Sequence, residues 1–332
     1  MKRVLFYSSV SEKSLFYYQR FYYTDIEIFK NLGYEVILSN SIGDAFKFRT
    51  YDLVFAYFYS YSFFVGLIAR CFGKPVYYTG GIDKLDKNWA SRKERYIKKW
   101  FFFLCYLISR KCIIVSETDM INVKKIVKSH SSKLFLSEHT IDVNPYLTLS
   151  HKEDSFSTIG WQGSGNIYRK GIDLAIKIYA RLILDGYFPK SKFYIIGKPD
   201  TGTPILKALV KNLNIEDRVV FTGGVSEEEK VNYLNRCKFY FQLSIFEGFG
   251  IAALEASCAK NILIHSGRGG LSNPIYKDMV LFDRDVDFEK AYQEMIKQIQ
   301  SFDNRTLEKT QAEIVERYSN ARRENDFKQI LS

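Results

Sequence analysis

Short apolar runs alternate with segments of helical periodicity through the first half of the chain. In the runs Arg3–Ser8, Glu35–Ser39 and Asp52–Tyr57 most positions are apolar, which predicts buried strands. Tyr22–Asn31 instead repeats apolar side chains every three or four residues, which predicts a helix, and Gly33 follows it as a stop signal. The alternation predicts the α/β class, with a parallel sheet covered by helices on both faces.

The same alternation restarts after His139–Asp154, a polar segment without clear periodicity. Ser157–Trp161 is the first predicted strand of the second series, and Glu308–Ile330 is predicted to form one long charged helix. We therefore expect two Rossmann-like domains, residues 1–148 and 149–310. A ligand is expected in the cleft at the carboxyl ends of the strands.

Composition excludes several classes of protein. With 332 residues, 46% of them hydrophobic, the chain is long enough to bury a sizeable core, and an aromatic content of 16% argues against disorder. Five scattered cysteines form no CxxC pair and indicate reduced thiols that act as small core residues, and four distant histidines give no zinc signature.

The longest uncharged run, Leu53–Ala69, is interpreted as a strand followed by a core helix. No secretory signal is expected, so a cytoplasmic location is predicted.

The positive charge is concentrated in the first half. Residues 1–150 contain 22 Lys and Arg against 13 Asp and Glu, whereas residues 151–332 contain 26 against 24. This half is expected to attract anions. The segment Arg92–Lys111 is interpreted either as an interfacial helix on an anionic membrane surface or as a core helix with a solvated basic end. Nucleic acid is not expected as a partner, because no recognition motif accompanies the charge.

The segment Ser244–Ala256 carries the most informative chemistry. It follows an apolar strand and opens a helix, and it places Glu247 and Glu255 eight residues apart. Gly248 and Gly250 allow the backbone to approach a ligand closely, and a helix N-terminus offers amides to a phosphate. Each glutamate alone has a simpler interpretation, as a turn residue or as a surface residue, but their joint placement around Gly-Phe-Gly favours a site.

This E-G-F-G-x-x-x-L-E-A run resembles the E-x7-E motif of the retaining family 4 glycosyltransferases, which have the GT-B fold of two Rossmann-like domains facing across a cleft. The resemblance covers about residues 157–285. Four other segments resemble further features of the family, in the same order along the chain. Arg169–Asp173 resembles its phosphate-binding Lys-Gly turn, and Phe193–Gly197 resembles the strand and glycine before its base pocket. Val220–Val225 resembles its Phe-x-Gly segment, and Ser266–Gly270 resembles its Ser-x-x-Gly-Gly turn.

The resemblance implies a role for each matching residue. Glu255 would bind the ribose hydroxyls of a nucleotide sugar, Glu247 would contact the hydroxyls of the donor sugar, and Lys170 would neutralise the diphosphate leaving group. Arg169, beside Lys170, is placed with these catalytic residues. The donor-binding residues on this interpretation are Glu255, Gly248, Phe249, Gly250, Gly163, Ser164, Gly197 and Val225.

The sequence departs from the family pattern in two places. Trp161 stands where the family usually has an Arg that contacts phosphate; Arg169 or the backbone amides of Ser164 and Gly165 are the candidates to replace it. The first-domain His that touches the donor sugar in many members is also missing. The corresponding segment offers acceptor-side or sugar-side candidates instead: Gly80, Gly81 and Asp83.

The resemblance implies a retaining, metal-independent glycosyltransferase that uses a UDP-sugar or GDP-sugar as donor and needs no other cofactor. The expected acceptor is a saccharide or a polyprenyl-diphosphate-linked saccharide, in cell-surface polysaccharide assembly at the inner face of the membrane. The helix over 311–332 is expected to cross back to the first domain, as in the family. Two alternatives remain: a sugar-nucleotide epimerase or hydrolase of the same fold, and a non-catalytic, membrane-associated partner of a glycosylation complex.

Overall fold

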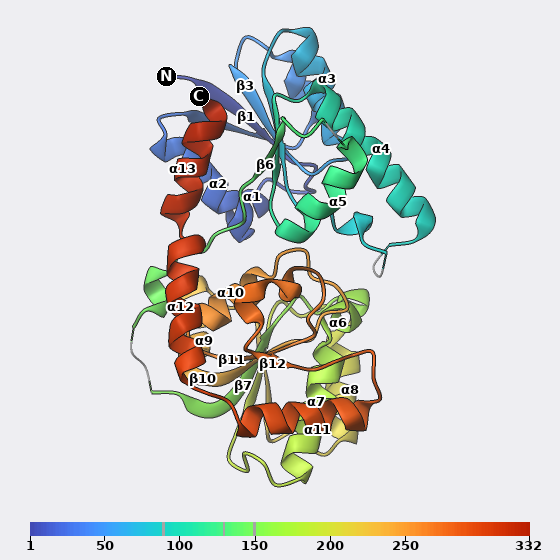
Figure 1. The fold of residues 1–332 in the computed structure, drawn as a ribbon, viewed down its shortest axis with the longest axis vertical. Coiled ribbons are helices and arrows are strands. Elements are labelled where there is room, and N and C mark those ends of the chain that lie inside the picture. The colour runs from blue at the N-terminus through green and yellow to red at the C-terminus, as the bar shows by residue number, and fades with distance from the viewer. Residues whose placement is uncertain (88–89, 129, 149–150) are drawn as a thin grey trace. The chain divides into compact units, whose positions relative to one another are not determined.

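The chain divides into two compact units (Figure 1). The structure is a computed structural model that describes residues 1–87, 90–128, 130–148 and 151–332. Unit 1 comprises Met1–Ile141 together with Tyr318–Ser332, and unit 2 comprises Asp142–Arg317. The chain therefore leaves unit 1 after Ile141 and returns to it at Tyr318. Residue 149, the expected first residue of the second domain, lies outside the described residues.

Unit 1 is built on a six-stranded parallel sheet with the strand order β2-β1-β3-β4-β5-β6. Its central strand β3 is buried at every position, because β1 and β4 pair with its two edges and helices cover both of its faces. The strands are β1 (Arg3–Tyr7), β2 (Glu35–Ser39), β3 (Leu53–Tyr57), β4 (Val76–Thr79), β5 (Lys111–Ile114) and β6 (Leu134–Leu136).

Two hydrophobic clusters show which helices cover each face of this sheet. On one face, α1, α2 and the C-terminal helix α13 contribute Phe16, Phe29 and Phe327. On the other face, α3, α4 and α5 pack on the sheet, with Phe102 and Val123 fully buried. The helices are α1 (Leu15–Tyr18), α2 (Arg20–Asn31), α3 (Ser62–Cys71), α4 (Arg92–Ile108), α5 (Glu117–Val127) and α13 (Asn320–Leu331).

Unit 2 contains a second six-stranded parallel sheet, with the order β12-β11-β10-β7-β8-β9. Helices α7, α8 and α11 share one core with its strands. The two sheets confirm the predicted α/β fold with two Rossmann-like domains. The strands are β7 (Glu153–Ile159), β8 (Phe193–Ile196), β9 (Val219–Gly223), β10 (Cys237–Gln242), β11 (Ile262–His265) and β12 (Val280–Leu281). The helices are α6 (Ser164–Lys170), α7 (Ile172–Leu184), α8 (Thr203–Asn212), α9 (Glu227–Arg236), α10 (Ile251–Cys258), α11 (Phe288–Gln300) and α12 (Arg305–Arg317).

Several predicted elements are wrong in detail. The single helix expected over Glu308–Ile330 is two helices, α12 and α13, because Ser319 is extended and the backbone N–H of Ile141 donates to the carbonyl of Tyr318 between them. Strand β7 begins at Glu153, earlier than expected. Of the five cysteines, Cys71 is exposed, and the other four are buried as predicted.

The longest uncharged run of the sequence, Leu53–Ala69, falls on β3 and most of α3, as predicted. In the described part of the chain, no helix combines the length and the apolar character that crossing a bilayer requires.

A buried ion pair anchors the C-terminal helix α13 to unit 1. The Arg323 guanidinium donates to both carboxylate oxygens of Asp25 on α2, at 2.6 and 2.9 Å, and to the backbone carbonyls of Ser137 and Glu138. Both side chains of the ion pair are inaccessible to solvent. Arg323 therefore compensates the buried Asp25 charge and also donates to two buried carbonyls. These contacts connect α13 to α2 and to the segment after β6.

We expect Arg323→Met to destabilise unit 1 by about 3–5 kcal/mol, because it leaves a buried carboxylate without its partner. Urea unfolding followed by circular dichroism measures this effect. Lys328→Met is the matched control on the same helix: its pair with Glu324 is partly exposed, so the expected loss is only about 0.5 kcal/mol. Equal losses in the two variants would contradict the anchoring role.

Candidate functional site

Glu247 lies in the loop between β10 and α10, at the carboxyl end of the second sheet. Three donors converge on one of its oxygens, Oε2: Lys170 Nζ at 2.7 Å, Gln242 Nε2 at 3.1 Å and the Ser244 hydroxyl at 3.0 Å. In the described part of the chain, no donor contacts the other oxygen, Oε1. The loop therefore holds the carboxylate by one oxygen and leaves the second for a ligand.

The charge state of Glu247 follows from two opposing effects. Burial raises the pKa of this carboxyl, but the neighbouring Lys170 and Arg169 charges and the Ser244 hydroxyl outweigh burial, so the pKa lies below its ordinary value. Glu247 is therefore ionised near neutral pH. It can accept hydrogen bonds from hydroxyl groups, and it cannot serve as a proton donor there.

Lys170 reaches Glu247 from the end of helix α6, which the sequence analysis interpreted as part of a turn. Gly171 follows in the left-handed region, with φ of 70°, and links α6 to α7. A Cβ at this position would lie 2.2 Å from the carbonyl oxygen of Leu243, so only glycine permits the close approach. The Ile245 N–H donates to the Arg169 carbonyl across the same junction, at 2.8 Å.

Arg169 connects two segments of the site through hydrogen bonds. Its guanidinium donates to the side-chain oxygen of Asn166 at 2.7 and 3.1 Å and to the carbonyl of Phe246 at 3.5 Å. These contacts join α6 to the loop that carries Glu247. Arg169 also adds positive charge beside the Glu247 carboxylate.

A second glycine-rich turn supports the loop from the other side. The Gly270 N–H donates to the Glu247 carbonyl at 2.6 Å. A Cβ on Gly269 would lie 2.1 Å from the carbonyl oxygen of Glu247, and one on Gly270 would lie 2.4 Å from that of Phe249. The turn and the Glu247 loop, which the sequence analysis singled out separately, are therefore in backbone contact.

Glu255 lies on α10 and is almost completely buried, with 3% of its surface exposed. Its Oε1 accepts a hydrogen bond from Lys230 Nζ on α9 at 2.8 Å, and Lys230 also pairs with Glu227. Burial lowers the pKa of Lys230, but the two carboxylates outweigh burial and hold it above its usual value. The sequence analysis missed Lys230, whose only signal was its place directly after the Ser226–Glu229 capping box.

The segment after β7 places the expected donor-binding residues Gly163 and Ser164 at the start of α6. The Trp161 ring is 54% exposed and lies so close to Gly163 that a Cβ there would be 2.8 Å from the indole. The Ser164 N–H donates to the Thr201 hydroxyl at 3.1 Å. The Ser164 amide, one of the groups expected to replace the charge missing at Trp161, therefore has a side-chain acceptor of unit 2 in this structure.

Gly197 and Val225 follow neighbouring strands of the second sheet. Gly197 has a φ of 149°, and a Cβ on it would lie 2.1 Å from the Gly160 carbonyl oxygen. Its N–H donates to the Gly223 carbonyl at 3.0 Å, which joins the ends of β8 and β9. Val225 is partly exposed in the loop after β9.

Gly80, Gly81 and Asp83 lie at the carboxyl end of β4 in unit 1. Gly80 has a φ of 108°, and a Cβ there would lie 3.1 Å from the backbone nitrogen of Phe58, which itself donates to the Thr79 carbonyl at 2.7 Å. Asp83 opens a short 3-10 helix, Asp83–Leu85. The three acceptor-side candidates thus share one end of the first sheet.

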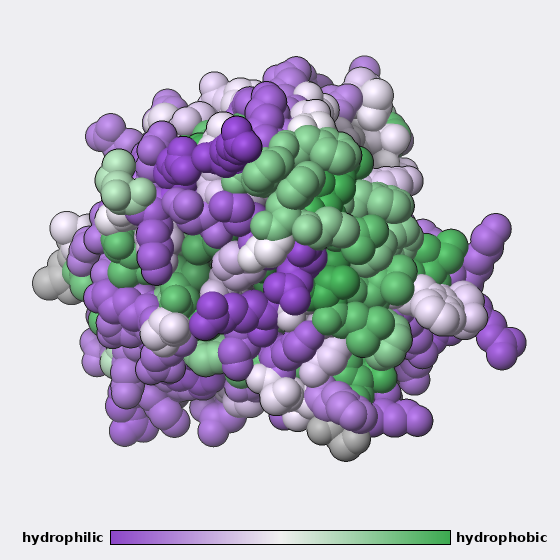
Figure 2. All heavy atoms as spheres, turned by 90° about the horizontal axis from the view of Figure 1, so that it is seen from above, coloured by the Kyte–Doolittle hydropathy of each residue, from purple (hydrophilic) through white to green (hydrophobic). Residues whose placement is uncertain are grey.

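The basic and aromatic segment Arg92–Lys111 forms helix α4 and the start of β5. A Ser91–Glu94 capping box begins the helix. Its apolar second half is not buried all round: the core takes Phe102, Cys105 and Tyr106, while an exposed stripe runs along the opposite side, made of Tyr96, Trp100, Phe103 and Leu107. Figure 2 shows a broad apolar patch on the face of unit 1 where α3 and α4 lie.

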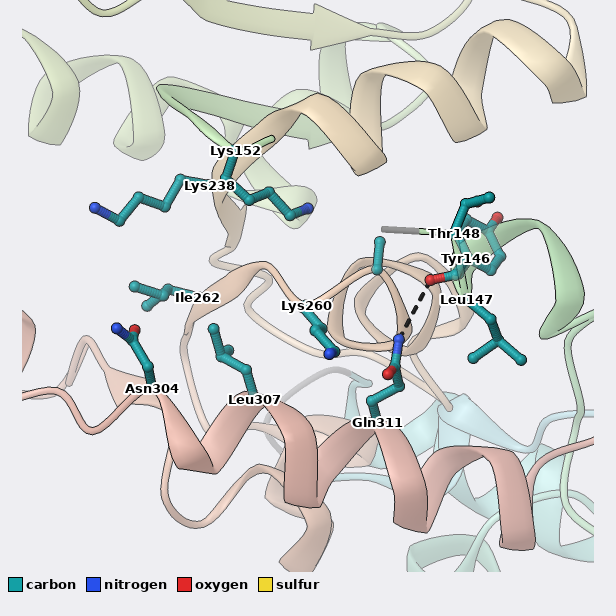
Figure 3. Close-up of a pocket in the computed structure, with 11 residues that line it drawn as sticks. Tyr146, Leu147, Thr148, Lys152, Lys238, Lys260, Ile262, Asn304, Leu307 and Gln311 are labelled. Carbon is teal, nitrogen blue, oxygen red and sulfur yellow. Dashed lines mark hydrogen bonds between the residues drawn. The ribbon is translucent and has the colours of Figure 1, made fainter. Parts of the chain in front are cut away.

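Unit 2 also contains a cavity of about 340 Å³ that the sequence analysis did not predict. Lys152, Lys238 and Lys260 line it, together with Tyr146 and Gln311 among others (Figure 3). Lys152 donates to the Leu234 carbonyl at 2.8 Å, and burial lowers its pKa to about 8. The ammonium groups of Lys152 and Lys238 point in opposite directions, so their charges do not converge on one position in the cavity (Figure 3).

The residues that the structure describes include no group of three His, Cys, Asp or Glu side chains that could hold a metal ion.

Comparison with known families matches residues 164–315 to the model of glycosyl transferases group 1. This segment includes Lys170, Lys230, Glu247 and Glu255. It also includes the Gly269–Gly270 turn, so the match covers the residues that the structure gathers around the Glu247 loop.

Curated relatives carry related descriptions. The chain is 23% identical over 294 residues to the O-antigen chain mannosyltransferase RfbU of Salmonella typhimurium, covering 82% of this chain and 79% of RfbU. It is 26% identical over 213 residues to the Campylobacter jejuni N-acetylgalactosamine-N,N'-diacetylbacillosaminyl-diphospho-undecaprenol 4-alpha-N-acetylgalactosaminyltransferase, covering 59% of this chain and 53% of that protein. The match to CapJ of Staphylococcus aureus is 29% identical, but it covers only 39% of this chain and 32% of CapJ. The chain thus spans about half the Campylobacter protein and a third of CapJ.

Among solved structures, Anabaena HepE in complex with UDP and glucose has a TM-score of 0.75 and 15% identity, with 100% of this chain and 99% of HepE covered. A glycosyltransferase from Rickettsia africae gives the same TM-score and identity over the same shares of the two chains. The chain therefore has the GT-B fold, and its second unit carries the segment that the group 1 glycosyl transferase model describes.

Proposed function

We propose that this chain is a retaining glycosyltransferase that moves a sugar from a nucleoside diphosphate sugar to a saccharide or lipid-linked acceptor, in cell-surface polysaccharide assembly. The observation that carries the proposal is the Lys170–Glu247 pair at the carboxyl end of the second sheet. The group 1 match over residues 164–315 supports it, as do relatives whose names describe sugar transfer to a diphospho-undecaprenol-linked saccharide or an O-antigen chain.

The donor would lie along the carboxyl ends of the second sheet. Glu255 is buried and pairs with Lys230. In this proposal its carboxylate binds the two ribose hydroxyls. Glu247 is ionised, and its Oε1 is the acceptor for hydroxyls of the donor sugar. The HepE complex supports a nucleotide in this kind of fold, because its structure contains UDP.

The chemical step breaks the bond between the anomeric carbon and the diphosphate. Negative charge grows on the departing phosphate oxygen while the sugar becomes oxocarbenium-like. The Lys170 ammonium stabilises that growing charge, so the step needs no metal ion. The acceptor hydroxyl attacks the face that the diphosphate leaves. Its proton passes to the departing phosphate oxygen. Because attack and departure take place on the same face, the anomeric configuration is retained.

The exposed stripe of α4 suggests where the acceptor is met. Tyr96, Trp100, Phe103 and Leu107 face solvent beside the exposed basic residues Arg92, Lys93 and Lys99. Aromatic and basic side chains in this arrangement suit the boundary between anionic headgroups and acyl chains. We therefore propose that unit 1 binds the inner face of an anionic membrane through α4, where a lipid-linked acceptor is available.

Nucleotide binding tests the donor site. A thermal-shift panel of UDP, GDP, ADP, CDP and dTDP, with and without EDTA, should show stabilisation by UDP or GDP that EDTA does not change. Glu255→Gln should weaken that binding about tenfold, since it removes a charge-assisted hydrogen bond. Glu228→Gln, at an exposed position of α9, should leave it unchanged. A shift with none of the five nucleotides would contradict the donor site.

Turnover tests the role of Lys170. Lys170→Met should lower kcat by about 10²–10³-fold, because it removes the cation at the leaving group. Without Lys170, the largest effect that lowers the pKa of Glu247 is lost and this pKa rises. The variant should therefore lose its remaining activity at a higher pH than the wild type as the solution is acidified. Lys177→Met, at an exposed position of α7, is the control. Conversion of the donor to its epimer without any acceptor would instead support an epimerase.

Flotation with liposomes tests the membrane surface. Recovery on vesicles that contain anionic lipid should fall several-fold in Trp100→Ser/Leu107→Ser and in Lys93→Glu/Lys99→Glu, and added salt should weaken binding of the wild type. Leu184→Ser, which changes a side chain in unit 2 that is 81% exposed, is the matched control. Equal recovery of all variants would contradict the proposal.

A further inference from the structure

Unit 1 contains a cavity that is lined by none of the residues described above for the donor. Its volume is about 390 Å³, within the range of about 300–1,000 Å³ that small-molecule sites occupy. It opens at the carboxyl end of the first sheet, where ligands of such sheets bind. Two chain segments and one helix line it: Phe58–Tyr61 after β3, Lys84 after β4, and Glu94, Ile97, Lys98 and Phe101 of α4.

The backbone at the cavity edge is strained. Phe58 has a φ of 65°, in the left-handed region that a bulky aromatic residue rarely adopts. Its N–H donates to the Thr79 carbonyl, which holds the strain in place. Strain of this kind in a non-glycine residue is concentrated at functional sites. It turns the Phe58–Tyr61 segment so that it forms one wall of the cavity.

The two lysines of the cavity are in different situations. Lys84 pairs with Glu94 at 2.9 Å, and Ser91 donates to the same carboxylate, so both charges are compensated. Lys98 is partly buried, and within the described residues no acceptor lies within hydrogen-bond or ion-pair distance of its ammonium. Among the described residues that line the cavity, Lys98 is therefore the cation that remains for a bound anion.

The pKa values around Lys98 agree with that picture. Burial lowers the pKa of Lys98, while the carboxyl groups of Asp83 and Asp119 oppose that effect only in part. Burial and the neighbouring Asp83 raise the pKa of Asp119 to about 7, so its charge is incomplete near neutral pH. An anion placed against Lys98 would compensate a charge that its own surroundings leave partly unsatisfied.

The cavity is continuous with the exposed apolar surface of unit 1. Tyr61 and Phe101 both line the cavity, their ring centroids are 6.4 Å apart, and Tyr61 is largely exposed. Ile97 also lines the cavity and is exposed beside the α4 stripe, and Phe64 and Leu67 extend the surface along α3. A ligand that joins an anionic group to a hydrocarbon chain would satisfy both features at once.

We propose that this cavity is the acceptor subsite, in which Lys98 binds the phosphate of a lipid phosphate or diphosphate ester whose hydrocarbon chain lies along the apolar surface of α3 and α4. This inference rests on the proposed function and names the class of acceptor: an amphiphilic phosphate ester that carries the accepting sugar. A neutral soluble saccharide would use neither the Lys98 charge nor the apolar surface beside it.

Isothermal titration calorimetry with farnesyl diphosphate, inorganic diphosphate and farnesol tests this assignment. The wild type should bind farnesyl diphosphate at least about tenfold more tightly than either of the other two probes, because each probe lacks one of the two recognised parts. Lys98→Met should weaken farnesyl diphosphate binding about tenfold or more. Lys125→Met, at an exposed position of α5 in the same unit but outside the cavity, should change it less than twofold.

A second variant guards against misfolding in Lys98→Met. Ile97→Glu adds a carboxylate at an exposed position on the cavity rim, so it should also weaken farnesyl diphosphate binding while the thermal midpoint stays unchanged. Equal weakening by Lys98→Met and Lys125→Met would mean diffuse attraction to a basic surface, and would overturn the subsite. Equal affinity for inorganic and farnesyl diphosphate would mean a free-phosphate site, and would overturn the lipid assignment.

The nucleotide panel, run on the same preparations, separates this inference from the proposed function. Nucleotide binding that persists in a wild type unable to bind farnesyl diphosphate would overturn the acceptor subsite alone. Absence of nucleotide binding with farnesyl diphosphate binding intact would overturn the proposed function and the acceptor role, leaving only a lipid-phosphate site.

Discussion

The ion pair between Lys170 and Glu247 is the interaction around which the site in unit 2 is built. Burial raises the pKa of this glutamate, and the carboxylate stays ionised because Lys170, 2.7 Å away, together with Arg169 and Ser244, outweighs burial. The pair requires the end of α6 to touch the loop after β10, and Gly171 permits that contact. Gly269 and Gly270 permit the third segment to close against the same loop. The ion pair and the glycines therefore depend on one another. Charge attraction holds α6 and the Glu247 loop together, and the absence of glycine side chains lets the backbones come close enough.

This arrangement explains why the three segments that meet at Glu247 can be picked out from the sequence. Glycines at positions where a Cβ would meet a backbone carbonyl, and charged residues beside them, leave a pattern that is visible without coordinates. The segments Arg169–Asp173, Ser244–Ala256 and Ser266–Gly270 were each predicted as parts of a site, and the structure brings all three together. The two sheets were predicted for a similar reason, since strands buried on both faces need continuous apolar runs such as Leu53–Tyr57.

What the sequence did not predict depends on partners that are distant along the chain. Lys230 meets Glu255 only because α9 and α10 are neighbours in the folded unit. Helix α6 is short, and its end at Arg169 and Lys170 was interpreted as part of a turn. The tail has helical periodicity through Ser319, yet the helix breaks there because the N–H of Ile141, far away in sequence, takes the Tyr318 carbonyl. In each case a tertiary contact decides between local alternatives that the sequence leaves close in energy.

Helix α4 combines several structural features that its amino-acid composition alone does not reveal. Its second half has apolar residues on every side, which is the pattern of burial all round, yet Trp100 and Leu107 remain 51% and 53% exposed. A protein that leaves such a stripe in water loses the free energy that covering it would release, and the proposed membrane surface would cover it. On the same helix, Lys98 faces a cavity in which its charge is only partly compensated. An apolar stripe alone would suit any hydrophobic partner, and a half-compensated lysine alone would suit any anion. The two features occur side by side on one rigid helix, so an amphiphilic anion accounts for both with a single ligand.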